Sequence, residues 1–231
     1  MQYSFGIIIP CFNEEKTVFN VVNNICNKLP DCQIIVVDDG STDNSNSEIK
    51  KINQNNLTLI ELQKNSGKGA AMRKGLDFIK DKKEIVIFTD ADSEILIEDI
   101  IKIKIFYEEN ECEALFGTRF QNMSRSTIIK MGLHRYIANK FLTILTNFLF
   151  KQNISDMETA LKSFKSKYIN LMDLKSDGFE IEPELVKEIS RLGIKIKEIP
   201  VNYEPRSVKD GKKISFKDGY YTLKWLIKFS R

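Results

Sequence analysis

Short, almost wholly apolar segments alternate with segments of helical periodicity along the first half of the chain. Residues 33–37 and 84–89 are rich in β-branched side chains and lack the polar alternation of a half-exposed strand. Such segments are typical of strands buried on both faces of a parallel sheet. The alternation predicts a doubly wound α/β fold, in which helices flank a mostly parallel, twisted sheet. The expected strands are 5–9, 33–37, 57–62, 84–89 and 114–117, and the expected helices are 17–29, 43 onward, 68–79 and 95–107.

The size of the chain suits one large domain, with 231 residues of which 42% are hydrophobic. Its net charge of +3 hides an asymmetry: residues 1–118 contain 13 Lys/Arg against 20 Asp/Glu, whereas residues 119–231 contain 22 against 12. A basic second half indicates an anionic partner such as a phosphate or an acidic membrane surface, although a lysine-rich solvated surface has the same composition. No nucleic-acid-binding motif surrounds these basic residues, so we expect no nucleic-acid partner.

Cysteine usage and hydropathy bear on the compartment. The four cysteines form no C-x-x-C pair, and His134 is the single histidine, so we expect neither a zinc site nor a disulfide framework. No segment reaches the roughly 18 consecutive apolar residues that a membrane-spanning helix needs. We therefore expect a cytoplasmic protein, either soluble or in peripheral contact with the cytoplasmic membrane face.

Acidic residues follow three of the expected strands. Glu14 comes after the first strand, Asp39 after the second, and Asp90 and Asp92 after the fourth. Ligands of open α/β sheets bind outside the carboxyl ends of the strands. We therefore expect these carboxylates to converge on one ligand-binding edge.

The segment Asp90-Ala91-Asp92 gives that edge a specific chemistry. A chain with 14 Asp residues contains about one D-x-D by chance, so the motif gains its weight from its place at a strand end. Mg²⁺ and Mn²⁺ prefer oxygen ligands and commonly bind one or two protein carboxylates together with substrate phosphates. The sequence therefore predicts a divalent metal site, the alternative being that Asp92 or Ser93 caps the next helix.

Two further residues at this edge have both a binding and a local interpretation. Asp39 is an acceptor for hydrogen bonds from a ribose or a base, or else a turn former in the sequence Asp-Gly-Ser. Lys68 lies in a glycine-containing loop at a helix start, where the backbone can approach a phosphate closely. That loop lacks the spacing of a phosphate-binding P-loop.

Five short sequence motifs occur in order along the first 120 residues. They are PCFNEE (10–15), VVDDGSTD (36–43), NSGKGAA (65–71), DAD (90–92) and GTR (117–119). In order and spacing they resemble family 2 glycosyltransferases of the GT-A nucleotide-diphospho-sugar transferase fold, near the dolichol-phosphate mannose and polyprenyl-phosphate sugar synthase branch. Less sharp matches follow at 156–162, at 179–184, where a helix is expected to begin, at 199–203, which is expected to be a late strand, and at Arg206 with 211–213.

The resemblance implies one GT-A domain over 1–231, in which 1–118 binds the nucleotide sugar and metal and 119–231 binds the acceptor. It implies a Mg²⁺ or Mn²⁺ cofactor on Asp90 and Asp92, and an acceptor phosphate that binds Arg119 and Arg135. Arg206 and Lys212 match a basic loop that closes over the donor diphosphate. The donor is expected to contact Pro10, Phe12, Glu14, Val37, Asp39, Lys68, Asp90 and Ala91.

The reaction implied is an inverting displacement at the anomeric carbon, with two alternative acceptors. A polyprenyl phosphate is already anionic and needs no general base. A saccharide hydroxyl of a surface polysaccharide or glycolipid needs one, for which Asp156 is the first candidate and Glu158 the second. Both carboxylates have a simpler interpretation as caps, or as ion-pair partners of Lys162 at helical spacing. A third alternative, a non-catalytic nucleotide-sugar-binding subunit, is disfavoured because the acidic residues and Arg206 are all present.

Two amphipathic segments bear on the choice of acceptor. Residues 128–150 interleave large apolar side chains with Lys130, Arg135 and Lys140. The segment fits an interfacial helix that receives a lipid, or equally a helix packed on the sheet. Residues 220–231 are basic and amphipathic, which fits either membrane-surface contact or a closing helix.

Overall fold

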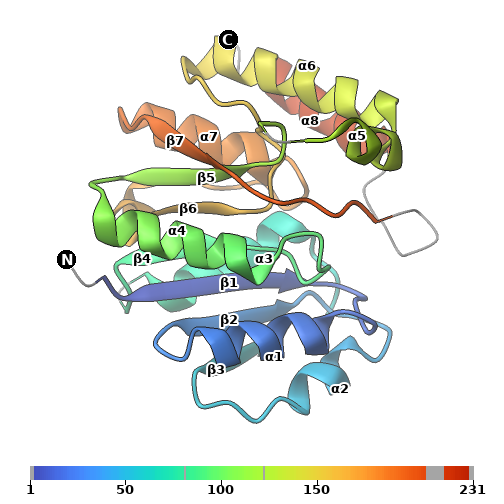
Figure 1. Cartoon of the computed structure of the whole chain (residues 1–231), viewed down its shortest axis with the longest axis vertical. Coiled ribbons are helices and arrows are strands. Elements are labelled where there is room, and N and C mark those ends of the chain that lie inside the picture. Colours follow the sequence, from blue (N-terminus) through green and yellow to red (C-terminus); the bar gives the residue numbers. More distant parts are fainter. Residues whose placement is uncertain (1–2, 81, 122, 207–215, 229–231) are drawn as a thin grey trace.

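A seven-stranded sheet forms the centre of the molecule, with the strand order β3-β2-β1-β4-β6-β5-β7 (Figure 1). The computed structural model describes residues 3–80, 82–121, 123–206 and 216–228. All strand pairs are parallel except those of β6, which runs antiparallel to both β4 and β5. The mostly parallel α/β fold expected from the sequence is therefore confirmed. The strands are β1 (Phe5–Cys11), β2 (Gln33–Asp38), β3 (Leu57–Glu61), β4 (Ile85–Phe88), β5 (Ala114–Thr118), β6 (Lys162–Lys165) and β7 (Ile196–Pro200).

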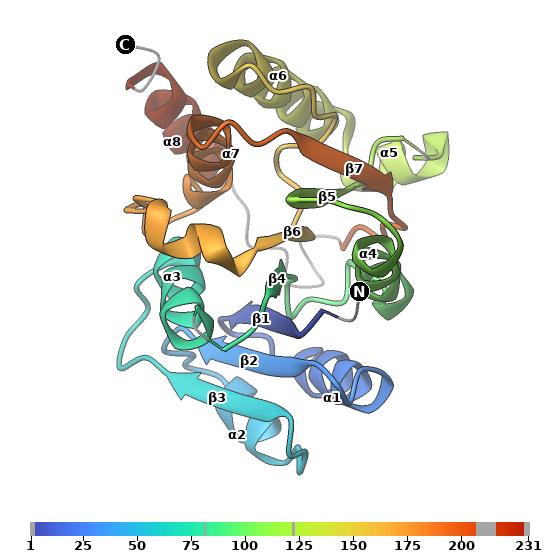
Figure 2. The ribbon, with the colours of Figure 1, turned by 90° about the vertical axis from the view of Figure 1, so that its left-hand side faces the viewer.

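Helices cover both faces of the sheet (Figure 2). One face packs against α1 (Val18–Lys28), α2 (Ser45–Lys50) and α4 (Ile97–Glu109), and their buried side chains form the first core. The other face packs against α3 (Lys68–Ile79) and α7 (Ile181–Arg191). The remaining elements are α5 (Arg125–Met131), α6 (Leu133–Phe150), the 3₁₀ turn η1 (Ser166–Leu171) and α8 (Phe216–Lys228), of which α6 and α8 complete the second core.

The first strand illustrates why the central strands are apolar throughout. Successive side chains of a strand point to opposite faces of the sheet. Ile7 and Ile9 pack into the core beneath α1 and α4, while Ile8 packs into the core beneath α3. All three are fully buried, since each face of the sheet is covered by helices.

Three elements of the second half differ from the sequence-based expectation. The segment 128–150 is two helices rather than one, because Gly132 adopts a φ of +94° between α5 and α6. Strand β7 begins at Ile196, three residues before the expected 199. Strand β6 was not expected, since its first residue, Lys162, is charged and yet fully buried.

The strands β6 and β7 from the second half of the chain continue the sheet that the first half begins. The carboxyl ends of β1, β2 and β4 therefore face residues that come from far along the sequence. Within the described residues, no helix is both long and apolar enough to cross a membrane.

Candidate active site

A cavity of about 1100 Å³ opens at the carboxyl ends of β1, β2 and β4. The parallel register places Pro10 beside Val37 and Cys11 beside Asp38, so the loops that follow these strands meet at one edge. The convergence expected of the acidic residues is present. Of the residues predicted from the sequence, those that line the cavity are Pro10, Phe12, Glu14, Asp39, Lys68, Asp90, Ala91, Asp92, Arg119, Arg135, Glu158 and Arg206.

Two of the predicted site residues that the structure describes do not line this cavity. Val37 is fully buried, and its side chain packs in the second core instead of facing the cavity. Asp156 is also fully buried and is not among the residues that line the cavity. Lys212 lies outside the described residues.

Arg206 joins the acidic groups that follow β1 and β4. Its Nη1 and Nη2 donate to the two carboxylate oxygens of Glu14, at 2.8 and 3.1 Å, and Nη2 also donates to Oδ2 of Asp92 at 2.9 Å. The backbone N–H of Arg206 donates to Oε1 of Glu94 at 2.8 Å. A guanidinium group from the end of the chain thus neutralises carboxylates from two separate loops.

Lys68 forms an ion pair with Asp90, the other aspartate of the D-x-D segment. Its Nζ lies 2.9 Å from Oδ1 of Asp90 and 2.9 Å from Oε1 of Glu182. Glu182 in turn contacts Nζ of the buried Lys162, which also donates to the carbonyl oxygen of Met157 at 2.8 Å. Alternating charges therefore connect Asp90 to the interior, and Lys162 pairs with Glu182 rather than with Glu158.

Asp92 carries the strongest signature of a cation site. Burial, together with the nearby charges of Asp90 and Glu94, raises the pKa of Asp92 to about 7, although the charge of Arg206 lowers it. A divalent cation between two such carboxylates would relieve this repulsion. The capping alternative is not what the structure adopts, because the N-cap of α4 is Leu96.

The donor set also fits a cation that is shared with a substrate. Among the described residues, no group of three or more His, Cys, Asp or Glu side chains is arranged to hold a metal ion. Mg²⁺ and Mn²⁺ commonly take one or two protein carboxylates and complete their coordination with water and phosphate oxygens. Asp90 and Asp92 therefore fit a metal that also binds a diphosphate.

Asp39 fixes the loop that leads into α3. Its two carboxylate oxygens accept the backbone N–H groups of Ser66 and Gly67, both at 2.8 Å. Burial raises the pKa of Asp39, and these two hydrogen bonds lower it. The turn itself is formed by the neighbouring Asp38, whose Oδ1 accepts the N–H of Ser41 at 3.0 Å.

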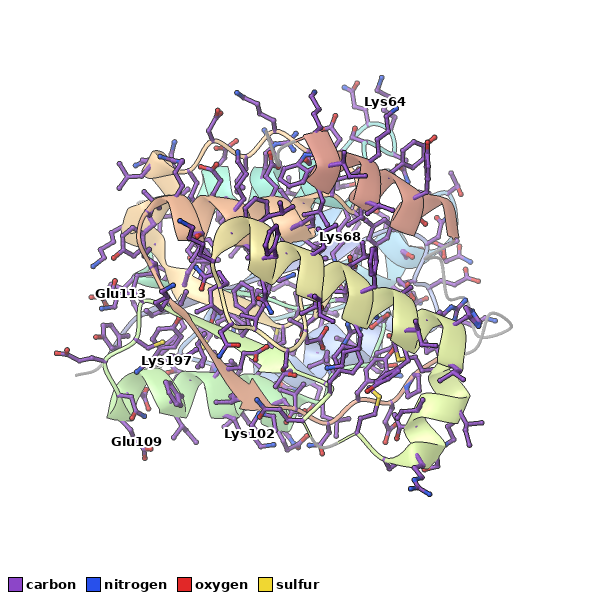
Figure 3. The ribbon with its side chains drawn as sticks, turned by 90° about the horizontal axis from the view of Figure 1, so that it is seen from above. Lys64, Lys68, Lys102, Glu109, Glu113 and Lys197 are labelled. Carbon is purple, nitrogen blue, oxygen red and sulfur yellow. The ribbon has the colours of Figure 1, made fainter. Side chains whose placement is uncertain are left out.

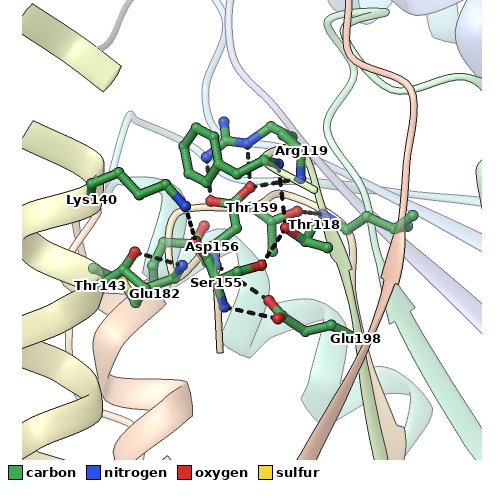
Figure 4. Close-up of polar contacts among 12 residues, drawn as sticks. Thr118, Arg119, Lys140, Thr143, Ser155, Asp156, Thr159, Glu182 and Glu198 are labelled. Carbon is green, nitrogen blue, oxygen red and sulfur yellow. Dashed lines mark hydrogen bonds and ion pairs between the residues drawn. The ribbon is translucent and has the colours of Figure 1, made fainter. Parts of the chain in front are cut away.

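Arg119 and Asp156 form a buried pair in the wall of the cavity (Figure 4). Nε and Nη2 of Arg119 each donate to a carboxylate oxygen of Asp156 at 2.7 Å, and the Arg119 backbone N–H adds a bond of 3.0 Å. The guanidinium also lies near the rings of Phe120 and Tyr203. With both carboxylate oxygens engaged, Asp156 holds Arg119 in place and does not face a substrate, which corrects its predicted rank as first candidate for a base.

Glu158, two residues further on, does line the cavity. Its carboxylate forms no hydrogen bond or ion pair with any residue that the structure describes. Burial, together with the charge of Glu182, raises the pKa of Glu158 to about 7, although the charges of Lys162, Arg119 and Lys68 lower it.

The far end of the cavity is bounded by α6 and α8. Viewed from above, α6 runs across the molecule beside α8 (Figure 3). Arg135 of α6 contributes a charge, while Phe141 and Leu142 of α6 and Leu223 of α8 contribute apolar surface. The cavity thus has a highly charged end at the sheet and a mainly apolar end beneath these helices.

Sequence reasoning assigned no role to several residues that line the cavity. Glu94 lies two residues after the D-x-D segment, and Glu182 and Tyr203 lie within segments that matched the family only loosely. Glu182 lies in the first turn of α7, and an acidic residue at that position was a usable sequence signal for a site residue. Nothing in the local sequence, however, indicated its contact with Lys68.

The comparisons with known proteins agree with this geometry. Residues 6–171 match the model of Glycosyl transferase family 2. The chain is 31% identical to an uncharacterised protein of Methanocaldococcus jannaschii over 87% of this chain and 89% of that one. It is 28% identical to the UDP-N-acetylglucosamine–dolichyl-phosphate N-acetylglucosaminyltransferase of Methanococcus voltae, over 84% and 83%. Glucosyl-3-phosphoglycerate synthase of Mycobacterium tuberculosis, crystallised with Mn²⁺, uridine diphosphate and phosphoglyceric acid, has a similar fold, with a TM-score of 0.72, 16% identity and coverage of 99% and 78%.

A cavity that joins clustered carboxylates at a parallel sheet edge to a basic and apolar end defines a nucleotide-sugar transferase of the GT-A type. The chain belongs to glycosyl transferase family 2.

Proposed function

We propose that this glycosyltransferase moves a hexosyl group from a nucleoside-diphosphate sugar to a polyprenyl phosphate, with inversion at the anomeric carbon. The observation that carries this proposal is the polarity of the large cavity. Asp90 and Asp92 follow β4 at its sheet end, Arg119 follows β5, and Arg135 lies with apolar side chains of α6 and α8 at its other end. The relative from Methanococcus voltae, named for transfer to dolichyl phosphate, supports this choice of acceptor.

The donor belongs at the sheet end of the cavity. Asp90 and Asp92 would hold Mg²⁺ or Mn²⁺, which supplies charge neutralisation to the departing diphosphate. The Mn²⁺ and uridine diphosphate of the mycobacterial structure support this assignment. Lys68 and Arg206 form ion pairs with these carboxylates, which supports a role for both as donors to diphosphate oxygens. Pro10, Phe12, Glu14 and Asp39 would frame the nucleoside.

The acceptor phosphate belongs beside Arg119 and Arg135. Arg presents planar N–H groups that match phosphate oxygens, and Asp156 keeps Arg119 in one orientation. An oxygen of the acceptor phosphate forms the new bond to the anomeric carbon, while the bond from that carbon to the diphosphate breaks and its electron pair leaves with the nucleoside diphosphate. The attacking oxygen is already anionic, so this reaction needs no general base.

A saccharide hydroxyl is the second candidate acceptor, and one observation favours it. Such a reaction needs a base, and Glu158 is a carboxylate that lines the cavity with a pKa raised to about 7 by burial. Of the two carboxylates considered from the sequence, Glu158 rather than Asp156 would take this role.

We further propose that the enzyme contacts a membrane through α6. Ile137, Phe141, Ile144 and Phe148 recur at helical spacing and are all more than half exposed. Phe141 also lines the cavity, so this apolar stripe is continuous with the proposed acceptor end. The four buried cysteines form no disulfide and suit a reducing compartment, which supports contact with the cytoplasmic membrane face.

Transfer assays with different acceptors test the function. The purified chain is incubated with Mn²⁺ and radiolabelled UDP-glucose, UDP-N-acetylglucosamine or GDP-mannose, with a polyprenyl phosphate or with a soluble glycan. We expect label to enter the organic phase with polyprenyl phosphate. Label that enters only the soluble glycan would contradict the lipid acceptor, and absence of transfer from every donor would support a non-catalytic subunit.

A further inference from the structure

Glu158 lines the cavity near basic groups that belong to both the proposed donor site and the proposed acceptor site. Lys68, which contacts Asp90 at the donor end, and Arg119 at the acceptor end are both close enough to lower its pKa. If the diphosphate lies by Asp90 and the acceptor phosphate by Arg119, the transferred hexose lies between them. Glu158 therefore lines the segment of the cavity that the hexose would fill.

The backbone that carries Glu158 is held by buried polar contacts (Figure 4). The N–H groups of Ser155 and Asp156 donate to Glu198, at 2.8 and 3.2 Å, and the N–H of Met157 donates to the hydroxyl of Thr143 at 3.1 Å. These contacts come from β7 and α6, on two sides of the loop. A side chain on such a fixed loop has a defined position before any substrate binds.

The chemistry of the carboxylate restricts its partner. A partly buried carboxylate in a cavity wall accepts hydrogen bonds from a ligand, and Glu158 receives none from the described residues. The diphosphate and the acceptor phosphate are both anionic, so Glu158 repels them. The hexose is neutral and carries several hydroxyl donors, and it is therefore the part of the substrates that satisfies this group.

We propose that Glu158 is a specificity-determining residue, which accepts hydrogen bonds from hydroxyl groups of the donor hexose. This inference rests on the proposed function and adds the group that selects the sugar. A site that hydrogen-bonds a hydroxyl rejects the analogue that lacks it, because the buried polar group is then left without a partner.

Deoxy analogues of the donor test the inference. Binding of UDP-glucose, UDP-N-acetylglucosamine and GDP-mannose is measured by calorimetry with Mn²⁺, and the donor that binds best is compared with its 2-, 3-, 4- and 6-deoxy forms. For the wild type, we expect removal of at least one hydroxyl to weaken binding by about 30-fold or more. In Glu158→Ala, the parent donor and that deoxy form should bind within about threefold of each other. Equal discrimination in both proteins, or none in the wild type, would overturn the proposal.

Three controls isolate the contact between Glu158 and the hexose. Glu180 lies at the N-terminal end of α7 and outside the cavity, so Glu180→Gln should keep the discrimination of the wild type. UDP and GDP contain no hexose, so their binding should not change in Glu158→Ala, and a loss there would indicate a damaged fold and contradict the assignment.

If Glu158 is instead a base, Glu158→Gln loses kcat with an altered pH profile while binding still discriminates against deoxy donors, which would also overturn the proposal. Because binding is read without turnover, failure of the transfer assay would be a separate result.

Discussion

At the scale of single residues, the site depends on carboxylates that share a chemistry but differ in their partners. Asp92 binds Arg206 and lies near other carboxylates, and both oxygens of Asp156 bind Arg119. Glu158 faces the cavity without a protein partner among the described residues. Their surroundings, rather than their residue type, distinguish the roles that we propose for them in metal binding, positioning and substrate recognition.

Asp92→Ala should abolish metal-dependent transfer and leave the fold intact. The side chain is a predicted metal ligand, and its removal relieves rather than creates unfavourable charge. We expect kcat/KM with Mn²⁺ to fall by about 1,000-fold or more, with no loss of thermal stability by circular dichroism. The exposed Asp173→Ala serves as the matched control. Undiminished turnover by Asp92→Ala would refute the metal assignment.

Glu158→Gln should stabilise the protein above neutral pH. The pKa of Glu158 is raised from 4.5 to about 7 in the folded state, so the wild type loses stability as the pH rises through this range. The gain at pH 8 should be on the order of 2 kcal/mol and should vanish near pH 4.5. Urea unfolding of both proteins at the two pH values measures this, and an equal difference at both would show that ionisation of Glu158 is not its cause.

At the scale of elements, the loop before α3 shows how backbone conformation sets the site. Gly67 has a φ of +101° and donates its N–H to Asp39, at the point where α3 begins with Lys68. A Cβ atom at Gly67 would overlap the carbonyl oxygen of Asp177. The loop is therefore confined both by its own conformation and by the segment that precedes α7.

Gly67→Ala should destabilise the fold by about 2–4 kcal/mol, from combined strain and steric overlap. Gly193→Ala is the matched control, because its φ of +75° brings strain while no atom lies within 4 Å of the added Cβ. Denaturant unfolding should therefore rank the cost of Gly67→Ala above that of Gly193→Ala. The reverse order would show that the contact with Asp177 does not constrain this loop.

The apolar stripe on α6 should govern membrane binding. Replacing Ile144 and Phe148 together by Ser removes two of its most exposed members, at 67% and 80%. We expect co-sedimentation with vesicles of phosphatidylcholine and phosphatidylglycerol to fall at least fivefold, while Ile105→Ser on α4 leaves it unchanged. Equal binding by all variants would exclude α6 as the contact.

At the scale of the whole molecule, the sequence predicts features that depend on neighbouring residues and does not predict contacts between residues far apart in the chain. The strands of the first half and the acidic residues at their ends were predictable, since apolar runs and the residues that follow them are adjacent in the chain. Strand β6 was not predictable because the charge of the buried Lys162 is balanced by Glu182, which lies 20 residues away. The contact that engages both oxygens of Asp156 was not predictable from its segment, because its partner, Arg119, lies 37 residues earlier.

The two ends of the cavity are proposed to act in one reaction, and product stoichiometry tests this coupling most directly. Nucleoside diphosphate and lipid-linked sugar are measured together as polyprenyl phosphate is increased at saturating Mn²⁺. We predict that both products rise with the acceptor in a ratio of about one to one, and that both are lost when EDTA removes the metal. Release of nucleoside diphosphate that does not depend on polyprenyl phosphate, or transfer that persists in EDTA, would contradict the proposed reaction.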